Sequence, residues 1–223
     1  MVKPSDIGYA SRSRKVLDKI HLVLGEISNI YLVEYEDGLI AVDAGSKGDH
    51  LKVLEYLRSI GYPPSSIRYI VITHAHGDHI GGLKELKDLT GALVAAHREE
   101  VPYLKGERVL RREVTPVDVD IVLEEGSLVG PLRVIHTPGH TPGSICLLEP
   151  STRTIFVGDL VHEKDGELYE IPHHYSQDPH KNRVAIASLL DLNFDNVAPS
   201  HGEPILGRGK EAVRRLVKRI LLT

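Results

Sequence analysis

Cysteine, tryptophan and long apolar segments are scarce or absent in this sequence. Its 223 residues include one cysteine, Cys146, so no disulfide can form within the chain. No segment approaches the ~18 consecutive apolar residues of a membrane span, and the first 24 residues contain no apolar run typical of a secretion signal. We therefore expect a cytoplasmic protein with no part in the membrane.

An excess of positive charge is also missing. The chain has 27 basic and 31 acidic residues and a net charge of -4. This balance argues against nucleic acid as a partner, because such binding depends on neutralising phosphates. Hydrophobic residues make up 41% of the chain and charged residues 26%, which is typical of globular proteins. No repeat or linker-like segment divides the chain, so we expect residues 1–223 to form one domain.

Short apolar segments separated by turn residues predict a mixed α/β fold. The expected strands are 20–24, 30–35, 39–42, 69–72, 92–96, 119–123, 132–135, 144–148 and 154–157. The expected helices are 47–60, 83–89, a segment after Pro179, and the closing segment around Val213 and Ile220. Because strands cluster in both halves and helices accompany each cluster, we expect two packed sheets with helices outside.

Two segments, 99–118 and 160–178, show no clear periodicity. Loops of about 20 residues in a compact domain are usually lids or binding loops, so both segments are candidate walls of a site. The sequence leaves open whether four of their side chains line it, namely Tyr103, His173, His174 and Tyr175.

Histidine is the residue type that stands out, with 13 in the chain. Directly after the strand 69–72, four side chains that can bind a metal fall within six residues: His74, His76, Asp78 and His79. The backbone turns at the end of a strand, so these side chains can point to one centre, and Gly81 and Gly82 allow close backbone approach. Imidazole nitrogens and carboxylate oxygens are typical metal ligands.

Three further candidates also follow apolar segments. His140 lies in the turn Thr-Pro-Gly-His-Thr-Pro-Gly, Asp159 follows the strand 154–157, and His201 follows 196–199. Each alone is typical of a turn residue, but side chains at strand ends along one sheet edge can meet, so we group them with the first four. His97 and His136 lie outside this pattern and are expected to be structural.

This order of residues resembles the pattern of the metallo-β-lactamase-fold superfamily: His-x-His-x-Asp-His, a later His, an Asp and a final His. The resemblance extends from about residue 20 to about residue 205. It implies a four-layer αββα sandwich of two mixed sheets flanked by helices, with a metal site at one edge of the sheets. The implied ligands are one set, His74, His76 and His140, a second set, Asp78, His79 and His201, and Asp159 as the bridge between two metal ions.

Asp43 resembles the family's early aspartate, which supports the site without being a ligand, although a polar turn residue explains it equally well. Five imidazoles and two carboxylates without a thiolate suit zinc, and iron or manganese would also fit. Two ions about 3.5–4 Å apart can share a water molecule and lower its pKa, which gives a bridging hydroxide near neutral pH. We therefore expect a dinuclear zinc hydrolase in which Asp78 orients the hydroxide proton, while Cys146 is a core residue.

Differences from the branches of the superfamily narrow the substrate class. Asp159 together with His79 argues against a true β-lactamase, whose ligand sets generally lack the bridging aspartate. The Thr-Pro-Gly-His turn is similar to hydroxyacylglutathione hydrolases (glyoxalase II), but only 22 residues follow His201, too few for that enzyme's glutathione-binding region. Lactonases of the family carry a tyrosine three residues after the bridging aspartate. This chain has His162 there, which could donate a hydrogen bond to the substrate oxygen.

We therefore expect cleavage of a small ester, thioester or lactone, with a small molecule as the partner. A phosphodiesterase or nuclease with the same two metals is the first alternative. The second is an oxidoreductase, because persulfide dioxygenases of this fold hold one iron through residues that correspond to His74, His140 and Asp159. A complete ligand set argues against a non-catalytic binding module. The oligomeric state stays open, and a homo-oligomer is compatible with the sequence.

Overall fold

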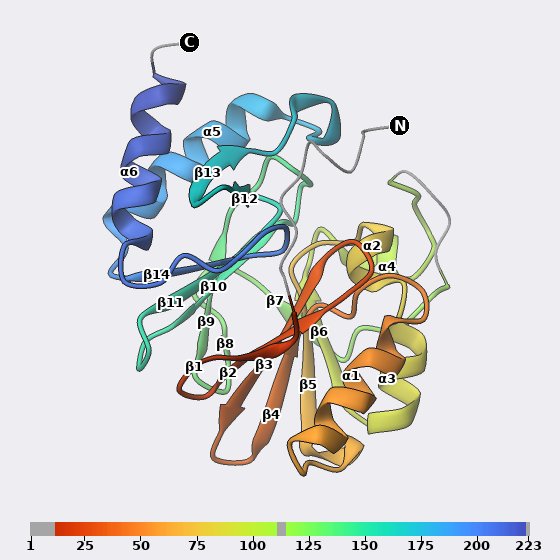
Figure 1. The fold of residues 1–223 in the computed structure, drawn as a ribbon. Helices are drawn as coiled ribbons and strands as arrows, with labels where there is room; N and C mark the ends of the chain where they lie inside the picture. Colours follow the sequence, from red (N-terminus) through yellow and green to blue (C-terminus); the bar gives the residue numbers. More distant parts are fainter. Residues whose placement is uncertain (1–11, 111–114, 222–223) are drawn as a thin grey trace.

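Two β-sheets packed face to face form the centre of the computed structural model, which describes residues 12–110 and 115–221 (Figure 1). Helices α1 (Asp49–Ser59) and α3 (Leu83–Thr90) cover one sheet, and α5 (Pro179–Ser188) and α6 (Gly209–Ile220) cover the other. Figure 1 shows these two helix pairs at lower right and upper left, on opposite sides of the sheets. The arrangement is the four-layer αββα sandwich that the sequence predicts.

The first sheet has seven strands in the order β1 to β7, antiparallel from β1 to β4 and parallel from β4 to β7. Its strands are β1 (Arg14–Leu17), β2 (Ile20–Leu24), β3 (Asn29–Tyr35), β4 (Gly38–Val42), β5 (Ile67–Ile72), β6 (Leu93–His97) and β7 (Ile121–Leu123). The hairpin predicted at Glu36-Asp37-Gly38 is present, since Tyr35 pairs with Gly38 across a two-residue turn. Strands β4 and β5 are parallel and therefore end at the same sheet edge.

The second sheet has five strands in the order β14-β11-β10-β9-β8. They are β8 (Leu128–Val129), β9 (Leu132–His136), β10 (Ile145–Glu149), β11 (Thr154–Gly158) and β14 (Asn196–Pro199). Strand β14 runs parallel to β11, and the other neighbours are antiparallel. Strands β9, β11 and β14 therefore point the same way and end at one edge.

Alternation along the strands produces three apolar layers. In β3, Tyr31 faces the core between the two sheets, whereas Leu32 faces the core beneath α1 and α3. In β11, Phe156 belongs to the core between the sheets, and Val157 belongs to the core beneath α5 and α6. Because both faces of the central strands are buried, these strands are almost continuously apolar, as the sequence suggested.

The segment 160–178 has more structure than its sequence indicated. It forms a separate hairpin of β12 (Val161–Lys164) and β13 (Glu167–Glu170), followed by the 3-10 helix η3 (His173–Tyr175). The missing signal is the turn Asp165-Gly166, in which both residues have positive φ angles of 54° and 80°. Such a dipeptide is a strong hairpin marker, so leaving this segment unassigned was wrong.

The remaining elements are short. They are η2 (Pro64–Ser66), α2 (Gly77–Ile80), α4 (Val101–Leu104) and η4 (Leu189–Asp191). Helix α4 lies within the other unassigned segment, 99–118, of which residues 111–114 are outside the described part of the chain. None of the helices in the described ranges is long and apolar enough to cross a membrane.

Candidate metal centre

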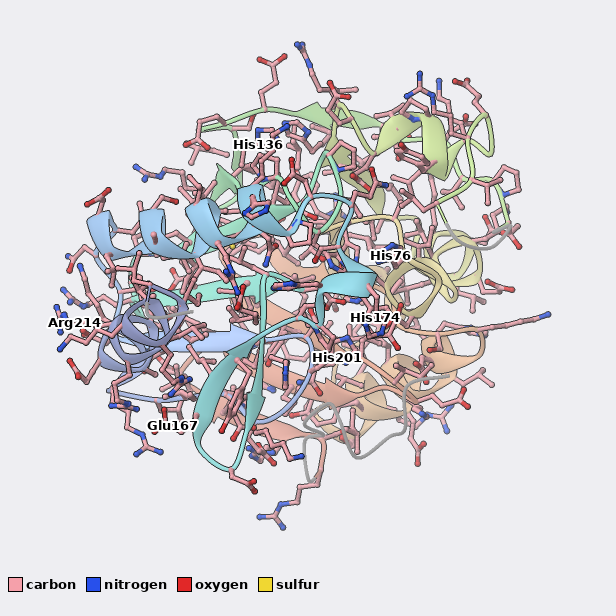
Figure 2. All side chains as sticks on the ribbon, turned by 90° about the horizontal axis from the view of Figure 1, so that it is seen from above. His76, His136, Glu167, His174, His201 and Arg214 are labelled. Carbon is pink, nitrogen blue, oxygen red and sulfur yellow. The ribbon has the colours of Figure 1, made fainter. Side chains whose placement is uncertain are left out.

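The seven predicted ligands come together at the edge where β5, β9, β11 and β14 end. His74 and His76 follow β5 directly, and Asp78 and His79 lie in the first turn of helix α2. The other three come from the second sheet: His140 from the β9–β10 connection, Asp159 after β11, and His201 after β14. His76 and His201 belong to different halves of the chain, and both lie near the middle of the view in Figure 2.

A first group consists of His74, His76, His140 and Asp159, all buried. Nε2 of His140 lies 2.9 Å from Nδ1 of His76 and 3.2 Å from Nε2 of His74. Oδ2 of Asp159 lies 3.4 Å from Nε2 of His140 and 3.8 Å from Nε2 of His74. Four ligands at the usual zinc distances would lie about 3.3 Å apart in a tetrahedron, so this spacing fits one small divalent ion.

A second group consists of Asp78, His79, Asp159 and His201. Oδ1 of Asp159 lies 3.2 Å from Nε2 of both His79 and His201. Oδ2 of Asp78 lies 3.6 Å and 3.5 Å from the same two nitrogens. The two groups share Asp159, which offers one carboxylate oxygen to each.

The chemistry of the described donor atoms fits a pair of cations. Nε2 of His79 and Oδ1 of Asp159 are buried and have no hydrogen-bond partner among the described residues. Buried polar atoms without partners are costly and rare, and a cation between them removes that cost. Because all donors are nitrogen or oxygen, zinc, iron and manganese all suit the set.

The electrostatics divide the histidines into two kinds. Burial lowers the pKa of His140 to about 3, and burial together with neighbouring imidazoles holds the pKa of His74 well below its usual value. Burial also lowers the pKa of His79, but the carboxylates of Asp159, Asp78 and Asp43 outweigh it and raise that pKa well above its usual value. His74 and His140 are therefore held neutral, as metal-binding imidazoles must be. The second group attracts positive charge.

Hydrogen bonds to Nδ1 orient three of the histidines, His74, His79 and His201. Nδ1 of His79 donates to Oδ2 of Asp43 at 2.8 Å, and Oγ1 of Thr73 donates to the same oxygen at 2.8 Å. Because the hydroxyl proton of Thr73 is donated to Asp43, Oγ1 of Thr73 accepts a hydrogen bond from Nδ1 of His74 at 3.1 Å. Nδ1 of His201 donates to the carbonyl of Ile27 at 3.2 Å. Each of these bonds leaves Nε2 facing the centre, so Asp43 has the supporting contact that the family resemblance implied.

Sequence reasoning missed Glu100, a fully buried carboxylate beside the centre. It lies three residues after β6 and accepts hydrogen bonds from Ala75, Thr141 and Gly143. A signal was available, because an acidic side chain just after a strand that ends at this edge is an expected contributor to a site there. Glu100 lies in the segment 99–118, whose lack of periodicity conceals the contacts that it makes.

Two further candidates, His162 and Tyr103, lie in different surroundings. His162 is only 5% exposed, and its ring stacks on Tyr169 with centroids 5.5 Å apart. Burial and the nearby His201 lower the pKa of His162, which indicates a position beside the second group. Tyr103 packs against the core beneath α1 and α3, which favours a structural role.

The loop around η3 lies against the His140 turn. The backbone N–H of Gln177 donates to the carbonyl of His140 at 3.1 Å, and that of Asp178 donates to the carbonyl of Gly139 at 2.9 Å. In this loop His173 and His174 are exposed and Tyr175 is partly buried. The loop therefore forms part of the wall, while the role of these three side chains stays a prediction.

The residues expected to be structural make contacts of their own, and Nε2 of His136 lies 2.9 Å from the carbonyl oxygen of Pro142 in the His140 turn. Cys146 is fully buried beneath α5 and α6, where burial raises the pKa of its thiol to about 12. His97 and His136 stack on each other with centroids 4.0 Å apart. A further buried histidine, His21, forms hydrogen bonds with Glu34 and Tyr56.

Comparisons with known proteins agree with this geometry. Residues 23–201 match the model of the metallo-beta-lactamase superfamily. The chain is 28% identical over 183 residues to the probable metallo-hydrolase YybB of Bacillus subtilis, which covers 79% of this chain and 81% of that protein. It is 30% identical over 206 residues to the acyl-coenzyme A thioesterase MBLAC2 of Gallus gallus, with 79% of this chain and 73% of that protein covered.

The extent of these matches varies. Across eight curated relatives, the matched part ranges from 41% to 86% of the relative's length, and it is less than two thirds for several of them. A solved structure with a similar fold is a metallo-beta-lactamase of Cronobacter sakazakii with an HARLDQ motif. It superimposes with a TM-score of 0.77 at 22% identity, covering 98% of this chain and 95% of that one. At this identity the likeness concerns the fold.

Proposed function

Since the chain belongs to the metallo-beta-lactamase superfamily, we propose that it is a hydrolase that binds two divalent metal ions, zinc foremost, and cleaves a small ester, thioester or lactone. Asp159 carries this proposal. Its two oxygens lie within 3.4 Å of His140 on one side and 3.2 Å of His201 on the other. A carboxylate placed between two sets of imidazoles is suited to join two ions.

The residues that would hold the ions are His74, His76 and His140 on one side, Asp78, His79 and His201 on the other, and Asp159 between them. Two such ions would supply a nucleophilic hydroxide near neutral pH and would polarise the carbonyl oxygen of the substrate. Burial of the imidazoles at this centre excludes bulk water, which strengthens electrostatic interactions within it.

Asp78 and His162 are the residues we propose for direct roles. The side chain of Asp78 is 24% exposed, which makes it more accessible than Asp159 at 8%. Asp78 can therefore accept a hydrogen bond from the attacking hydroxide and orient its proton. His162 would donate a hydrogen bond to the substrate oxygen, which is supported by its burial and by its partnerless Nδ1 within the described chain.

The substrate class is supported by the relatives and by charge. One relative bears the name of an acyl-coenzyme A thioesterase and another that of a hydroxyacylglutathione hydrolase. Both names describe cleavage of a thioester. The net charge of -4 favours a small molecule over nucleic acid as the partner.

We propose the cytoplasm as the location of the protein. The lone buried Cys146 is compatible with this reducing compartment.

Metal analysis combined with a substrate panel tests this function. We expect about two zinc ions per chain and measurable turnover of carboxylic esters, thioesters or lactones, lost in His76→Ala. His180→Ala is the matched control, because His180 is an exposed histidine on α5. Faster turnover of bis-p-nitrophenyl phosphate than of any carboxylic ester would point to a phosphodiesterase instead. One iron per chain with oxygen uptake on a persulfide would replace hydrolysis with oxidation.

A further inference from the structure

Glu100 connects the two loops that carry the histidines of the first group. Its Oε2 accepts the backbone N–H of Ala75 at 2.8 Å, and Ala75 lies between His74 and His76. Its Oε1 accepts Oγ1–H of Thr141 at 2.7 Å and N–H of Gly143 at 2.8 Å, beside His140. The side chain of Glu100, which follows strand β6 of the first sheet, thus binds both the His74–His76 loop and the His140 loop of the second sheet.

The loop around His140 is shaped to admit this carboxylate. A Cβ atom at position 143 would lie 2.7 Å from Cγ and 2.8 Å from Oε1 of Glu100, so only glycine allows the approach. Thr141 and Glu100 are both fully buried. The contact between the carboxylate and the His140 loop is therefore enclosed by protein.

The three donors match the acceptor capacity of the Glu100 carboxyl group. Two N–H groups and one hydroxyl point at the two oxygens, and a protonated carboxyl would set its own O–H against one of them. Burial raises the pKa of Glu100, and the hydrogen bonds from Thr141, Ala75 and Gly143 oppose that rise. One buried side chain therefore accepts all three of these hydrogen bonds.

We propose that Glu100 is a positioning residue for the three-histidine half of the centre, setting the distance between the His74–His76 loop and His140. This inference rests on the proposed metal-dependent function. It assigns Glu100 to one half only, since Asp43 orients His79 and the carbonyl of Ile27 orients His201. The first ion should therefore depend on Glu100 far more than the second.

The competing explanation is that Glu100 merely satisfies buried backbone donors. Glu149 provides the matched comparison, because it is also buried and accepts bonds from the N–H and hydroxyl groups of Ser151 and Thr152. Its turn lies at the start of β11, and Asp159 follows the other end of that strand. Glu100→Gln and Glu149→Gln therefore remove the same kind of acceptor near the centre and far from it.

The experiment titrates metal-free protein with zinc against a chromogenic chelator and follows both binding steps. For Glu100→Gln we expect one step to weaken 10- to 100-fold, the size typical of residues that orient metal ligands, and the other by less than threefold. Glu149→Gln should leave both steps unchanged. Cobalt substitution identifies the affected half, because the absorption of the ion bound by three histidines should change in Glu100→Gln.

A second pair of variants covers the case in which Glu100→Gln does not fold. Thr141→Val removes the hydroxyl that donates to Glu100, and Thr141→Ser keeps it. We expect Val to weaken the same zinc step at least threefold and Ser to restore it. Equal zinc affinities in wild type, Glu100→Gln and Thr141→Val would overturn the inference. A wild-type protein that binds two ions but cleaves no ester would instead contradict the proposed function, and the zinc titrations would still decide the role of Glu100.

Discussion

Asp43 accepts a hydrogen bond from Nδ1 of His79 at 2.8 Å, and neither side chain reaches solvent. Asp43 has a left-handed backbone with a φ angle of 63°, a conformation that is uncommon outside glycine and that clusters at functional sites. The strained turn aims the carboxylate at His79 and at the N–H and hydroxyl of Thr73. Asp43 therefore controls which nitrogen of His79 faces the centre.

Asp43→Asn should weaken metal binding. The amide offers only one acceptor oxygen, so its NH2 group would face one of the three donors that the carboxylate now accepts. We expect metal affinity to fall about 10- to 100-fold and the free energy of unfolding of the metal-free protein to fall by about 1–3 kcal/mol. Competition with a chelator measures the first quantity and urea unfolding the second.

Asp37→Asn serves as the control, because Asp37 lies in the exposed β3–β4 turn. That variant should match wild type in both measurements. Wild-type affinity in Asp43→Asn would show that His79 keeps its orientation without the carboxylate.

Much of this arrangement could be predicted from the sequence because its signals are local. The seven candidate ligands follow buried strands such as β5 and β11, and the ends of parallel strands meet at one edge. The apolar runs of these strands reveal burial on both faces, as Phe156 and Val157 show. The positions of His74 and Asp159 therefore follow from short segments, even though 85 residues separate them.

What could not be predicted depends on contacts between distant segments. Glu100 lies in a segment without periodicity, and its partners Ala75 and Thr141 are far away in sequence. The hairpin of β12 and β13 has a local signal in Asp165-Gly166, but that signal does not reveal its long-range contact, in which the N–H of Glu163 donates to the carbonyl of His201 at 2.9 Å. Only the fold shows that these residues lie beside the centre.

Removal of metal should lower thermal stability strongly. Seven buried or partly buried polar side chains converge at the centre, and each ion held at 100 times its dissociation constant stabilises the folded state by about 2.7 kcal/mol. For a chain of this length, two such ions correspond to a fall in Tm of about 10–20 °C on chelation. Calorimetry with EDTA, followed by addition of zinc, measures the loss and its recovery.

His76→Ala provides the internal comparison for chelation. Since it lacks one donor of the first group, EDTA should lower its Tm less than that of wild type. A wild-type Tm that does not change with EDTA would mean that no bound ion contributes to stability, which would contradict the proposed centre.

His162→Phe should reduce turnover without loss of metal. Phenylalanine keeps the stacking on Tyr169 but removes the ring nitrogens, so a hydrogen bond to the substrate oxygen disappears. Loss of one such donor typically costs about 100- to 1,000-fold in kcat. Steady-state kinetics on the best ester of the panel measures this effect, and elemental analysis checks that the metal content is unchanged.

Tyr169→Phe is the matched control for His162, because it retains the stacked ring and removes only the hydroxyl of an exposed tyrosine. We expect its kcat to stay within about threefold of wild type. If His162→Phe also retained wild-type kcat, the hydrogen bond assigned to His162 would not form in the reaction.

The His97–His136 stack should make the stability of the metal-free protein depend on pH. Burial lowers the pKa of His97 to about 4, and His136 and Arg98 add to this effect. The folded state therefore holds His97 neutral at a pH where an unfolded chain, with a histidine pKa near 6.5, is already protonated. Between these two values the unfolded state binds more protons, so stability is complete above about pH 6.5 and falls as the pH decreases toward 4.

His97→Phe should remove this loss, since phenylalanine keeps a flat ring against His136 and has no titrating group. We expect wild type to lose about 1–3 kcal/mol more than the variant between pH 7 and pH 4. Urea unfolding of both metal-free proteins across this range gives the difference directly, and comparison at pH 8 corrects for any change in packing. Parallel curves for the two proteins would show that protonation of His97 does not oppose folding. A steeper loss in the variant would mean that the charged ring stabilises the stack, which would reverse the sign that burial predicts.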